Sequence, residues 1–281
     1  MEFGASIFFT DYSISPAELA VALEERGFDS LWAAEHSHIP VPRRTPAPGG
    51  GELAKRYYDV MDPFVTLTAA AAATKKLKVA TGICLVIQRD TIQTAKLVAS
   101  IDQVTGGRFL FGIGGGWNAE EIEAHGTVFA TRMKKMREQM EAMKEIWTKT
   151  TAEYNGEIVK VPSMQTWPKP TQKPYPPILL GGESDHTLRR VVEFGNGWLP
   201  RRQREFDPDR AVARLRQAAA AAGRDPTTFS ITVFNAPADE AVLASYRKAG
   251  IHRVLLEVPD RGRDEVLRVL DRNARLARVL V

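Results

Sequence analysis

A histidine placed soon after an apolar stretch is the best candidate for proton chemistry. His36, next to Glu35, follows residues 28–33, which have the composition of a buried strand. A histidine can titrate near neutral pH and can hydrogen-bond an anion that develops during a reaction. We therefore expect His36 to act at a catalytic site, while the alternative for a lone histidine is a structural or surface role. His38, in the same loop, is a weaker candidate.

Two glycine-rich segments have the composition of ligand-binding loops. Glycine lets the backbone approach a ligand closely, and N–H groups at a helix N-terminus attract anions. The first segment lacks the spacing and the acidic residue of a dinucleotide-binding motif. In the second, a plain helix N-cap is an alternative role for Ser184. The segments comprise Gly114, Gly115, Gly116, Trp117 and Asn118, and then Gly181, Gly182, Glu183 and Ser184.

Other chemistries have less support in the sequence. Cys84 lies in a predicted strand with no histidine nearby, which favours a buried thiol over a nucleophile. The five histidines lack zinc-type spacing, and there is no carboxylate-rich metal loop, so no metal site is expected. Arg201, Arg202 and Arg204 form a small basic cluster that would either reach an anionic ligand or lie in a solvated loop.

Alternating strands and helices must position these residues. This alternation predicts parallel βαβ units with right-handed crossovers. Eight such units favour a (β/α)8 TIM barrel over a doubly wound open sheet, and a barrel keeps its chemistry at the C-terminal face. Strands are expected over residues 3–9, 28–33, 77–85, 109–113, 178–180, 197–200, 229–234 and 254–258. Helices are expected over 16–26, 63–76, 91–104, 119–125, 131–148, 185–194, 208–222, 238–249 and 264–280.

Two long loops interrupt the alternation. Residues 37–58 and 154–177 are rich in proline, and the first is also rich in glycine. Long loops inside a compact domain are usually functional or disordered. We expect both to overhang the C-terminal face as lids.

Composition excludes several classes of protein. The net charge is only +4, and the sequence has no basic stripe with interleaved aromatic residues of the kind that nucleic-acid binding requires. No apolar stretch reaches the roughly 20 residues of a membrane span, and the N-terminus has no basic region of a signal peptide. One cysteine fits a reducing compartment. We expect a cytoplasmic protein with no nucleic-acid or membrane partner.

The most informative stretch is 80–121, which contains TGICLV, IDQVTGGRF and FGIGGGWN. Further matching motifs are GFDSLW at 27–32 followed by Glu35 and His36, PILLGG at 177–182, and GNGW at 195–198. Together they resemble the luciferase-like monooxygenase superfamily, and within it the branch that uses coenzyme F420, an 8-hydroxy-5-deazaflavin. The resemblance spans most of the chain and becomes weaker after Arg204.

The resemblance implies a single TIM-barrel domain over residues 1–281 with the cofactor at the barrel mouth. It implies a cis peptide bond between Gly82 and Ile83 behind the cofactor ring, with the catalytic pair Glu35 and His36 beside the ring. The two glycine-rich segments would bind the cofactor, the second one through its phosphate. The basic cluster would reach the anionic tail of F420.

The function implied is hydride transfer between F420 and a small organic substrate, by a protein that is a homodimer like many relatives. The alternatives are an FMN-dependent monooxygenase of the same superfamily, a non-catalytic flavin- or deazaflavin-binding barrel, and a phosphate-binding barrel lyase.

Overall fold

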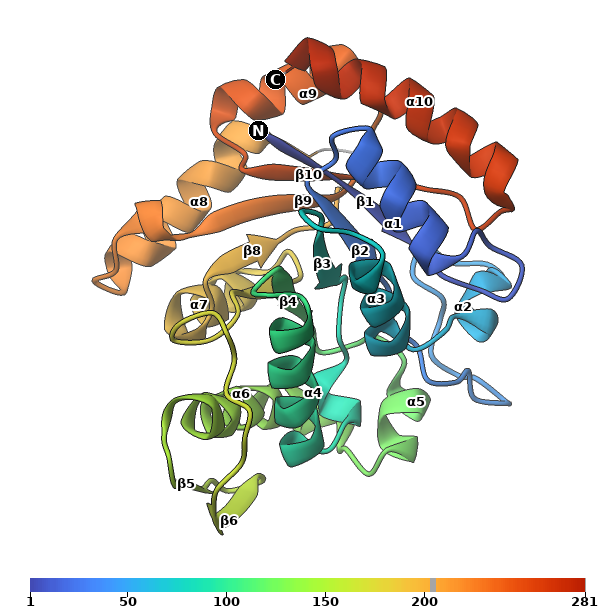
Figure 1. Ribbon diagram of the computed structural model, residues 1–281. Coiled ribbons are helices and arrows are strands. Elements are labelled where there is room, and N and C mark those ends of the chain that lie inside the picture. The colour runs from blue at the N-terminus through green and yellow to red at the C-terminus, as the bar shows by residue number, and fades with distance from the viewer. Residues whose placement is uncertain (203–205, 281) are drawn as a thin grey trace.

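The computed structural model describes residues 1–202 and 206–280, and parallel strands form a closed barrel at its centre (Figure 1). Within these residues the strand order around the barrel is β1-β10-β9-β8-β7-β4-β3-β2. The closed barrel confirms the predicted (β/α)8 fold and excludes the open sheet. The strands are β1 (Glu2–Ile7), β2 (Ser30–Ala33), β3 (Lys78–Thr81), β4 (Phe109–Ile113), β7 (Ile178–Gly181), β8 (Gly197–Leu199), β9 (Ser230–Ala236) and β10 (Arg253–Glu257).

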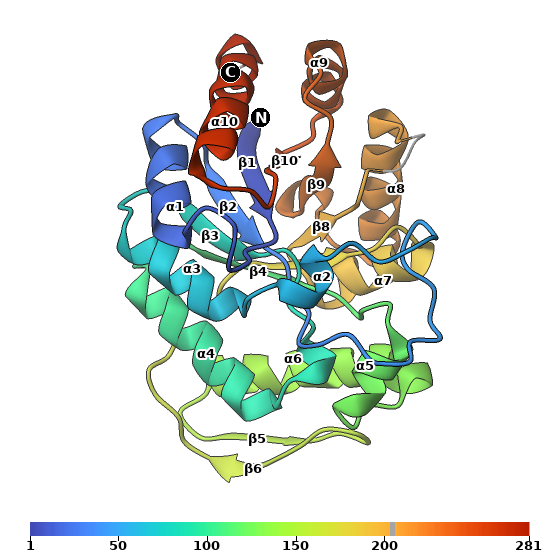
Figure 2. The same ribbon diagram turned by 90° about the vertical axis from the view of Figure 1, so that its right-hand side faces the viewer.

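Helices surround the barrel (Figures 1 and 2). Ser15 and Asp62 cap α1 and α3 by accepting hydrogen bonds from backbone N–H groups, and a proline follows each cap. Both helix starts were predicted from the sequence, because capping depends on neighbouring residues alone. In the described part of the chain, no helix combines the length and the apolar character needed to cross a membrane. The helices around the barrel are α1 (Pro16–Glu25), α3 (Pro63–Ala72), α4 (Thr91–Val104), α6 (Arg132–Thr148), α7 (Asp185–Phe194), α8 (Pro208–Ala221), α9 (Glu240–Ala249) and α10 (Arg263–Leu280).

Side chains fill the interior of the barrel. Trp32 on β2 is fully buried, and its Nε1 donates a hydrogen bond to Ser30 Oγ at 2.9 Å. A larger apolar cluster occupies the space between the strands and the helices. Because the interior is packed, a ligand has to bind at one end of the barrel. The side chains grouped with Trp32 are Ala80, Leu110, Leu179, Leu199 and Leu255.

The first and last strands close the barrel against each other. Glu2 on β1 stands opposite Arg253 on β10, and the two side chains form an ion pair. Arg253 is buried, and its Nε also donates to Asp29 Oδ2 at 2.7 Å. Two carboxylates therefore balance the buried guanidinium at this seam.

Strand β3 is shorter than the sequence predicts, ending at Thr81 instead of residue 85. The peptide bond between the next two residues, Gly82 and Ile83, is cis, as the resemblance implied. Beyond it the chain bulges out of the regular ladder, and Cys84 N donates to Gly112 O at 2.7 Å. The prediction was wrong here because residues 83–85 are as apolar as the strand before them.

The two long loops take different positions, the first at the barrel mouth and the second along the outside of α6. Residues 37–58 lead into α2 (Arg56–Asp59), which lies across the strand ends in Figure 2 and contributes to the cavity described below. Residues 154–177 instead contribute to a hairpin of β5 (Ala152–Asn155) and β6 (Lys160–Met164) beside α6 (Figure 1). From there the chain reaches the start of β4, where Gln172 Nε2 donates to Phe109 O at 2.8 Å.

The expected position of the second loop was therefore wrong. Helix α6 carries the chain away from the C-terminal face, so the segment that follows it begins at the far end of the barrel. This hairpin does not form a lid, whereas the loop that follows β2 directly starts at the C-terminal face.

Candidate active site

The carboxyl ends of the strands surround a cavity of about 160 Å³. His36, after β2, and Gly82 and Ile83, after β3, contribute to its wall, as do Gly116 and Trp117, which follow β4. Residues from the long loop contribute as well, including Arg56 and Tyr57. The structure thus brings together several site residues that were predicted from separate parts of the sequence. The other lining residues are Phe8, Ala34, Glu35, Pro48, Leu85, Arg201, Phe234, Asn235 and Glu257.

His36 is held by a buried carboxylate. Its Nδ1 lies 2.8 Å from Glu121 Oε2, and the two side chains are 8% and 1% exposed. The backbone N–H of Ser37 donates to the other oxygen of Glu121 at 3.1 Å. A carboxylate at Nδ1 fixes the orientation of the ring and stabilises a positive charge on it. This leaves Nε2 as the nitrogen that can exchange a proton with a ligand.

Aromatic rings pack around His36. The centroid of its ring lies 5.3 Å from that of Tyr57 and 5.8 Å from that of Trp117. Tyr57 in turn lies 4.9 Å from Phe8. Together these aromatic rings form an apolar wall, and a flat aromatic ligand packs well against such a wall.

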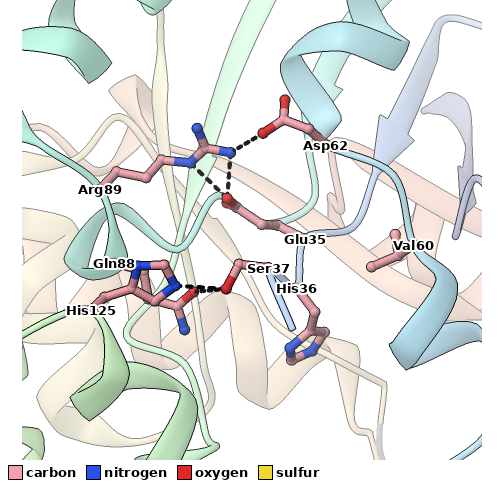
Figure 3. A pocket seen from close by; sticks show the side chains of 8 residues that line it. All are labelled: Glu35, His36, Ser37, Val60, Asp62, Gln88, Arg89 and His125. Carbon is pink, nitrogen blue, oxygen red and sulfur yellow. Dashed lines mark hydrogen bonds and ion pairs between the residues drawn. The ribbon is translucent and has the colours of Figure 1, made fainter. Parts of the chain in front are cut away.

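Glu35 forms part of an ionic network (Figure 3). Its Oε2 accepts a hydrogen bond from Leu85 N at 2.6 Å, and its Oε1 accepts one from Arg89 Nε at 2.6 Å. Arg89 also contacts Asp62 at 2.5 Å. Burial alone would lower the pKa of the Arg89 guanidinium, but Glu35, Cys84 and Asp62 together outweigh this effect and raise the pKa above the ordinary arginine value. Both oxygens of Glu35 are thus engaged in holding the segment after β3 against the end of β2.

We expect Arg89→Met to reduce the free energy of unfolding by about 3 kcal/mol, because a buried charge would lose its partner. The Glu35 side chain is 5% exposed. Urea unfolding measures the change. Arg137→Met is the matched control, since Arg137 also bridges two carboxylates but is 51% exposed, and it should cost less than about 1 kcal/mol. Equal losses in the two variants would show that the Glu35 pair is energetically an ordinary surface pair.

The three glycines after β4 have separate packing roles. A Cβ on Gly114 would lie 2.2 Å from Ile83 Cδ1, and one on Gly115 would lie 2.5 Å from Met133 Sδ. Gly116 has a φ of +63°, which other residues rarely adopt. A Cβ on Gly181 would also approach Ile83, at 3.3 Å from its Cγ2. Gly114, just after β4, and Gly181, at the end of β7, therefore make room for the side chain of Ile83, which follows the cis bond.

Asn118 has a buried amide with unsatisfied hydrogen-bonding capacity. The residue is 1% exposed, and neither Nδ2 nor Oδ1 has a hydrogen-bond partner within the described residues. A buried polar group without a partner costs about 1–3 kcal/mol. Asn118 directly follows Trp117 at the start of α5 (Ala119–Ala124), and it lines none of the cavities described in this section.

The second glycine-rich segment leads into α7. Ser184 Oγ accepts a hydrogen bond from Thr187 N at 3.2 Å, which confirms the N-cap interpretation. Glu183 Oε1 accepts one from Arg201 N at 2.9 Å. Beside this segment lies a second cavity of about 280 Å³, whose lining includes Glu183, Arg201, Arg210 and Arg214.

The predicted basic cluster is divided by the structure. Arg201 lines both the central cavity and the second cavity, so it links the two. Arg202 N donates to Phe234 O at 2.8 Å, which ties the backbone to β9. Arg204 lies outside the described residues.

Cys84 is fully buried, and burial followed by the nearby Glu35 charge raises the pKa of its thiol well above the usual value. The burial agrees with the prediction of a buried thiol. Over residues 1–202 and 206–280, there is no group of three or more His, Cys, Asp or Glu side chains that could hold a metal ion.

Several residues of the site were not predicted as functional from the sequence. Glu121 is an acidic residue in the first turn of α5, where acidic residues are common for reasons of helix electrostatics alone. Tyr57 lies in an irregular loop that gives no periodic signal. One indication of a role for Glu121 was present in the sequence, because this carboxylate lies three residues after the Trp117-Asn118 pair of the first glycine-rich segment.

Comparison with known proteins identifies the family. A family model described as luciferase-like monooxygenase matches residues 15–275. The chain belongs to the luciferase-like monooxygenase family. This agrees with the resemblance found in the sequence and with the barrel architecture.

Known proteins resemble this chain over nearly their whole length. An uncharacterised protein of Mycobacterium tuberculosis (strain H37Rv) is 35% identical over 278 residues, which is 98% of both chains. The solved structure of monooxygenase RslO1 from Streptomyces bottropensis matches with a TM-score of 0.79 at 20% identity, over 98% of both chains. The coenzyme F420-dependent tetrahydromethanopterin reductase from Methanopyrus kandleri matches with a TM-score of 0.75 at 17% identity, over 100% of this chain and 99% of that one.

Proposed function

We propose that this protein is an F420-dependent oxidoreductase that transfers a hydride between the deazaflavin and a small organic substrate. The main observation behind the proposal is the His36–Glu121 pair. In it, a buried carboxylate holds the His36 imidazole at the wall of the central cavity. Reduction of a carbonyl needs both a hydride and a proton, and this pair is suited to handle the proton. The similarity to a reductase described as F420-dependent points the same way.

The residues present fit such a cofactor. The aromatic wall formed by His36, Tyr57 and Trp117 suits a planar ring. Arg201 links the central cavity to a second cavity that contains further arginines, as a cofactor with an anionic tail requires. When bound, reduced F420 would supply the hydride.

In this proposal the first glycine-rich segment and the Gly82–Ile83 pair contact the ring. The segment of Gly181, Gly182, Glu183 and Ser184 binds the phosphate, and Arg201 the anionic tail. His36 donates a proton from Nε2 to the substrate oxygen, while Glu121 stabilises the charge on its ring. Glu35 is a positioning residue, because Leu85 N and Arg89 engage its two oxygens.

The second candidate function is that of an FMN-dependent monooxygenase. The similarity to monooxygenase RslO1 favours it. A binding protein without catalysis would share the cavity but would consume no reduced cofactor. We retain the expectations of a cytoplasmic location, a single domain and a homodimer; light scattering on the purified protein measures its mass in solution.

Titration of the purified protein with F420 and with FMN, followed by the fluorescence and absorption of each cofactor, tests the proposal. We expect F420 to bind at least tenfold more tightly than FMN. Tight FMN binding without affinity for F420 would exclude the F420 proposal and favour the monooxygenase. Consumption of reduced F420 in the presence of a panel of ketones and aldehydes then separates an enzyme from a binding protein.

Arg201→Ala should weaken F420 binding about 10- to 100-fold, because hydrogen bonds to charged groups contribute about 1.5–3 kcal/mol. The loss should shrink as the salt concentration rises, since salt screens the remaining attraction. Arg216→Ala is the control, because Arg216 is exposed on α8 and lines neither of the two cavities. If both variants bind F420 like the wild type, the tail lies elsewhere.

A further inference from the structure

The order of the strands divides the mouth of the barrel into two halves. The segments that the proposed function assigns to the cofactor ring and its phosphate come from the ends of β3, β4 and β7, which are neighbours in the barrel. The other half consists of β9, β10 and β1, which are also neighbours. His36, after β2, and Arg201, after β8, lie at the two borders between these halves. Because a substrate must lie beside the ring to exchange a hydride with it, the half formed by β9, β10 and β1 is the place left for the substrate.

We propose that Arg56, Glu257 and Asn235 form a substrate subsite in this second half, and that the subsite binds an uncharged carbonyl compound that carries a hydroxyl group. This inference rests on the proposed function, because it names the substrate class of that reaction. The three residues come from α2, β10 and β9, and all of them line the central cavity. None of them has a role in the function proposed above.

An ion pair forms the charged part of this subsite. Arg56 Nη1 contacts Glu257 Oε1, and the two side chains are 27% and 32% exposed. The guanidinium carbon of Arg56 lies 4.7 Å from the centroid of the Phe8 ring, which supports the arginine from one side. Within residues 1–202 and 206–280, Arg56 contacts Oε1 alone, so Oε2 of Glu257 can accept a hydrogen bond from a ligand. The pair brings hydrogen-bonding groups to the cavity without a net charge.

Asn235 adds an amide from the strand beside β10. Its φ is +57°, and no other residue besides glycine has a positive φ in the part of the chain that the structure describes. The register between β9 and β10 also shifts at this level, between Val254 and Leu256. Asparagine adopts this conformation more readily than most residues, and such strain is typical of functional sites. The irregular strand therefore places a hydrogen-bond donor and an acceptor at the cavity wall, next to the strand that carries Glu257.

These groups together select the chemistry of the substrate. A hydroxyl group can donate to Glu257 Oε2 and accept from the amide of Asn235. An alkyl group in the same place would leave these polar groups without the hydrogen bonds that they make to water. A carboxylate would be repelled by Glu257, and such like-charge contacts exclude wrong ligands. With its hydroxyl group held here, the substrate directs its carbonyl towards the border of the two halves, where His36 lies.

Three ketones of nearly equal size test the substrate class. Hydroxyacetone, butanone and pyruvate share an acetyl group, to which a hydroxymethyl, an ethyl or a carboxylate group is attached. We expect kcat/KM for the consumption of reduced F420 with hydroxyacetone to exceed the values with the other two ketones by about tenfold or more, because a site built for a polar group rejects analogues that lack it. Equal values for the three ketones, or a preference for butanone or pyruvate, would overturn the proposal.

Substitutions in the subsite should change this preference in different directions. Glu257→Gln keeps an oxygen for Arg56 but removes the charge that neutralises it, so pyruvate should gain about tenfold relative to hydroxyacetone. The double variant Arg56→Met with Glu257→Gln removes both charges and should lose this gain. Asn235→Gly keeps the positive φ without the amide, and it should reduce the preference for hydroxyacetone over butanone. Glu157→Gln is the matched control, because Glu157 also pairs with a single cation but does not line the cavity.

Binding to the protein without added cofactor separates the subsite from the proposed reaction. Saturation-transfer NMR measures the affinities of the three ketones for the wild type and each variant, and thermal unfolding checks that the variants are folded. The expected order of affinities, in a protein that consumes no reduced F420, would support the subsite and exclude the proposed function. Consumption of reduced F420 with the same pyruvate-to-hydroxyacetone ratio in Glu257→Gln and in the wild type would overturn the subsite and leave the proposed function intact. Hydroxyacetone that neither binds nor reacts would also overturn the subsite.

Discussion

His36→Ala should slow hydride transfer about 10²- to 10⁴-fold, the contribution expected of one proton donor or acceptor. The fold should persist, because His36 lies at the end of a strand and not in the packed interior of the barrel. F420 binding should remain within about tenfold of the wild type. The rate at which reduced F420 is consumed with a responsive carbonyl compound, together with the titration described above, measures both quantities.

Glu121→Gln refines this prediction. Glutamine can still hydrogen-bond to His36, but it carries no negative charge and cannot stabilise the protonated ring. We expect a rate between those of the wild type and of His36→Ala. His252→Gln, far from the cavity lining, should behave like the wild type. Unchanged turnover in His36→Ala would remove His36 from the proposed mechanism and leave the cofactor proposal intact.

Gly112→Ala should lower the free energy of unfolding by about 3 kcal/mol or more, because the new methyl group has no room. A Cβ at this position would lie 2.1 Å from the backbone oxygen of Thr81 and 3.2 Å from Trp32 Cζ3. The strand itself would have to shift, since the nearest atom belongs to the backbone. Urea denaturation measures the loss.

The same substitution should weaken cofactor binding. Gly112 O accepts hydrogen bonds from Thr81 Oγ1 and from Cys84 N, both at 2.7 Å, so it holds the bulge that carries Ile83 to the cavity. Gly262→Ala is the control, because nothing lies within 4 Å of a Cβ placed there, and it should cost at most about 1 kcal/mol. If Gly112→Ala has the same free energy of unfolding as the control, then β3 and β4 can move apart with no loss of stability.

Features that depend on neighbouring residues were predictable from the sequence. The caps at Ser15 and Asp62 require a short polar side chain and the proline after it. The barrel follows from the alternation of strands and helices, since parallel strands require crossovers. His36 and the glycine-rich segments were placed at the mouth by the strands that precede them.

Features that depend on distant contacts were not predictable in this way. Glu121 becomes part of the site because it meets a histidine 85 positions earlier in the chain. The early end of β3 depends on its fit against Gly112 and Gly114, since residues 83–85 have the same apolar character as the strand. The position of the β5–β6 hairpin depends on its contacts with α6, such as Ile158 N with Glu138 Oε2, and its composition alone did not show that it packs outside the barrel.

The seam between β1 and β10 has a consequence for how the protein is made. Glu2 and Arg253 are 251 positions apart, so the ribosome must release most of the chain before the ring of strands can close. Contacts of such long sequence separation form slowly. The central cavity includes residues of both early and late strands, such as Phe8 and Glu257. The nascent chain therefore has no complete binding site, and a cofactor can be captured only after synthesis has passed the last strand.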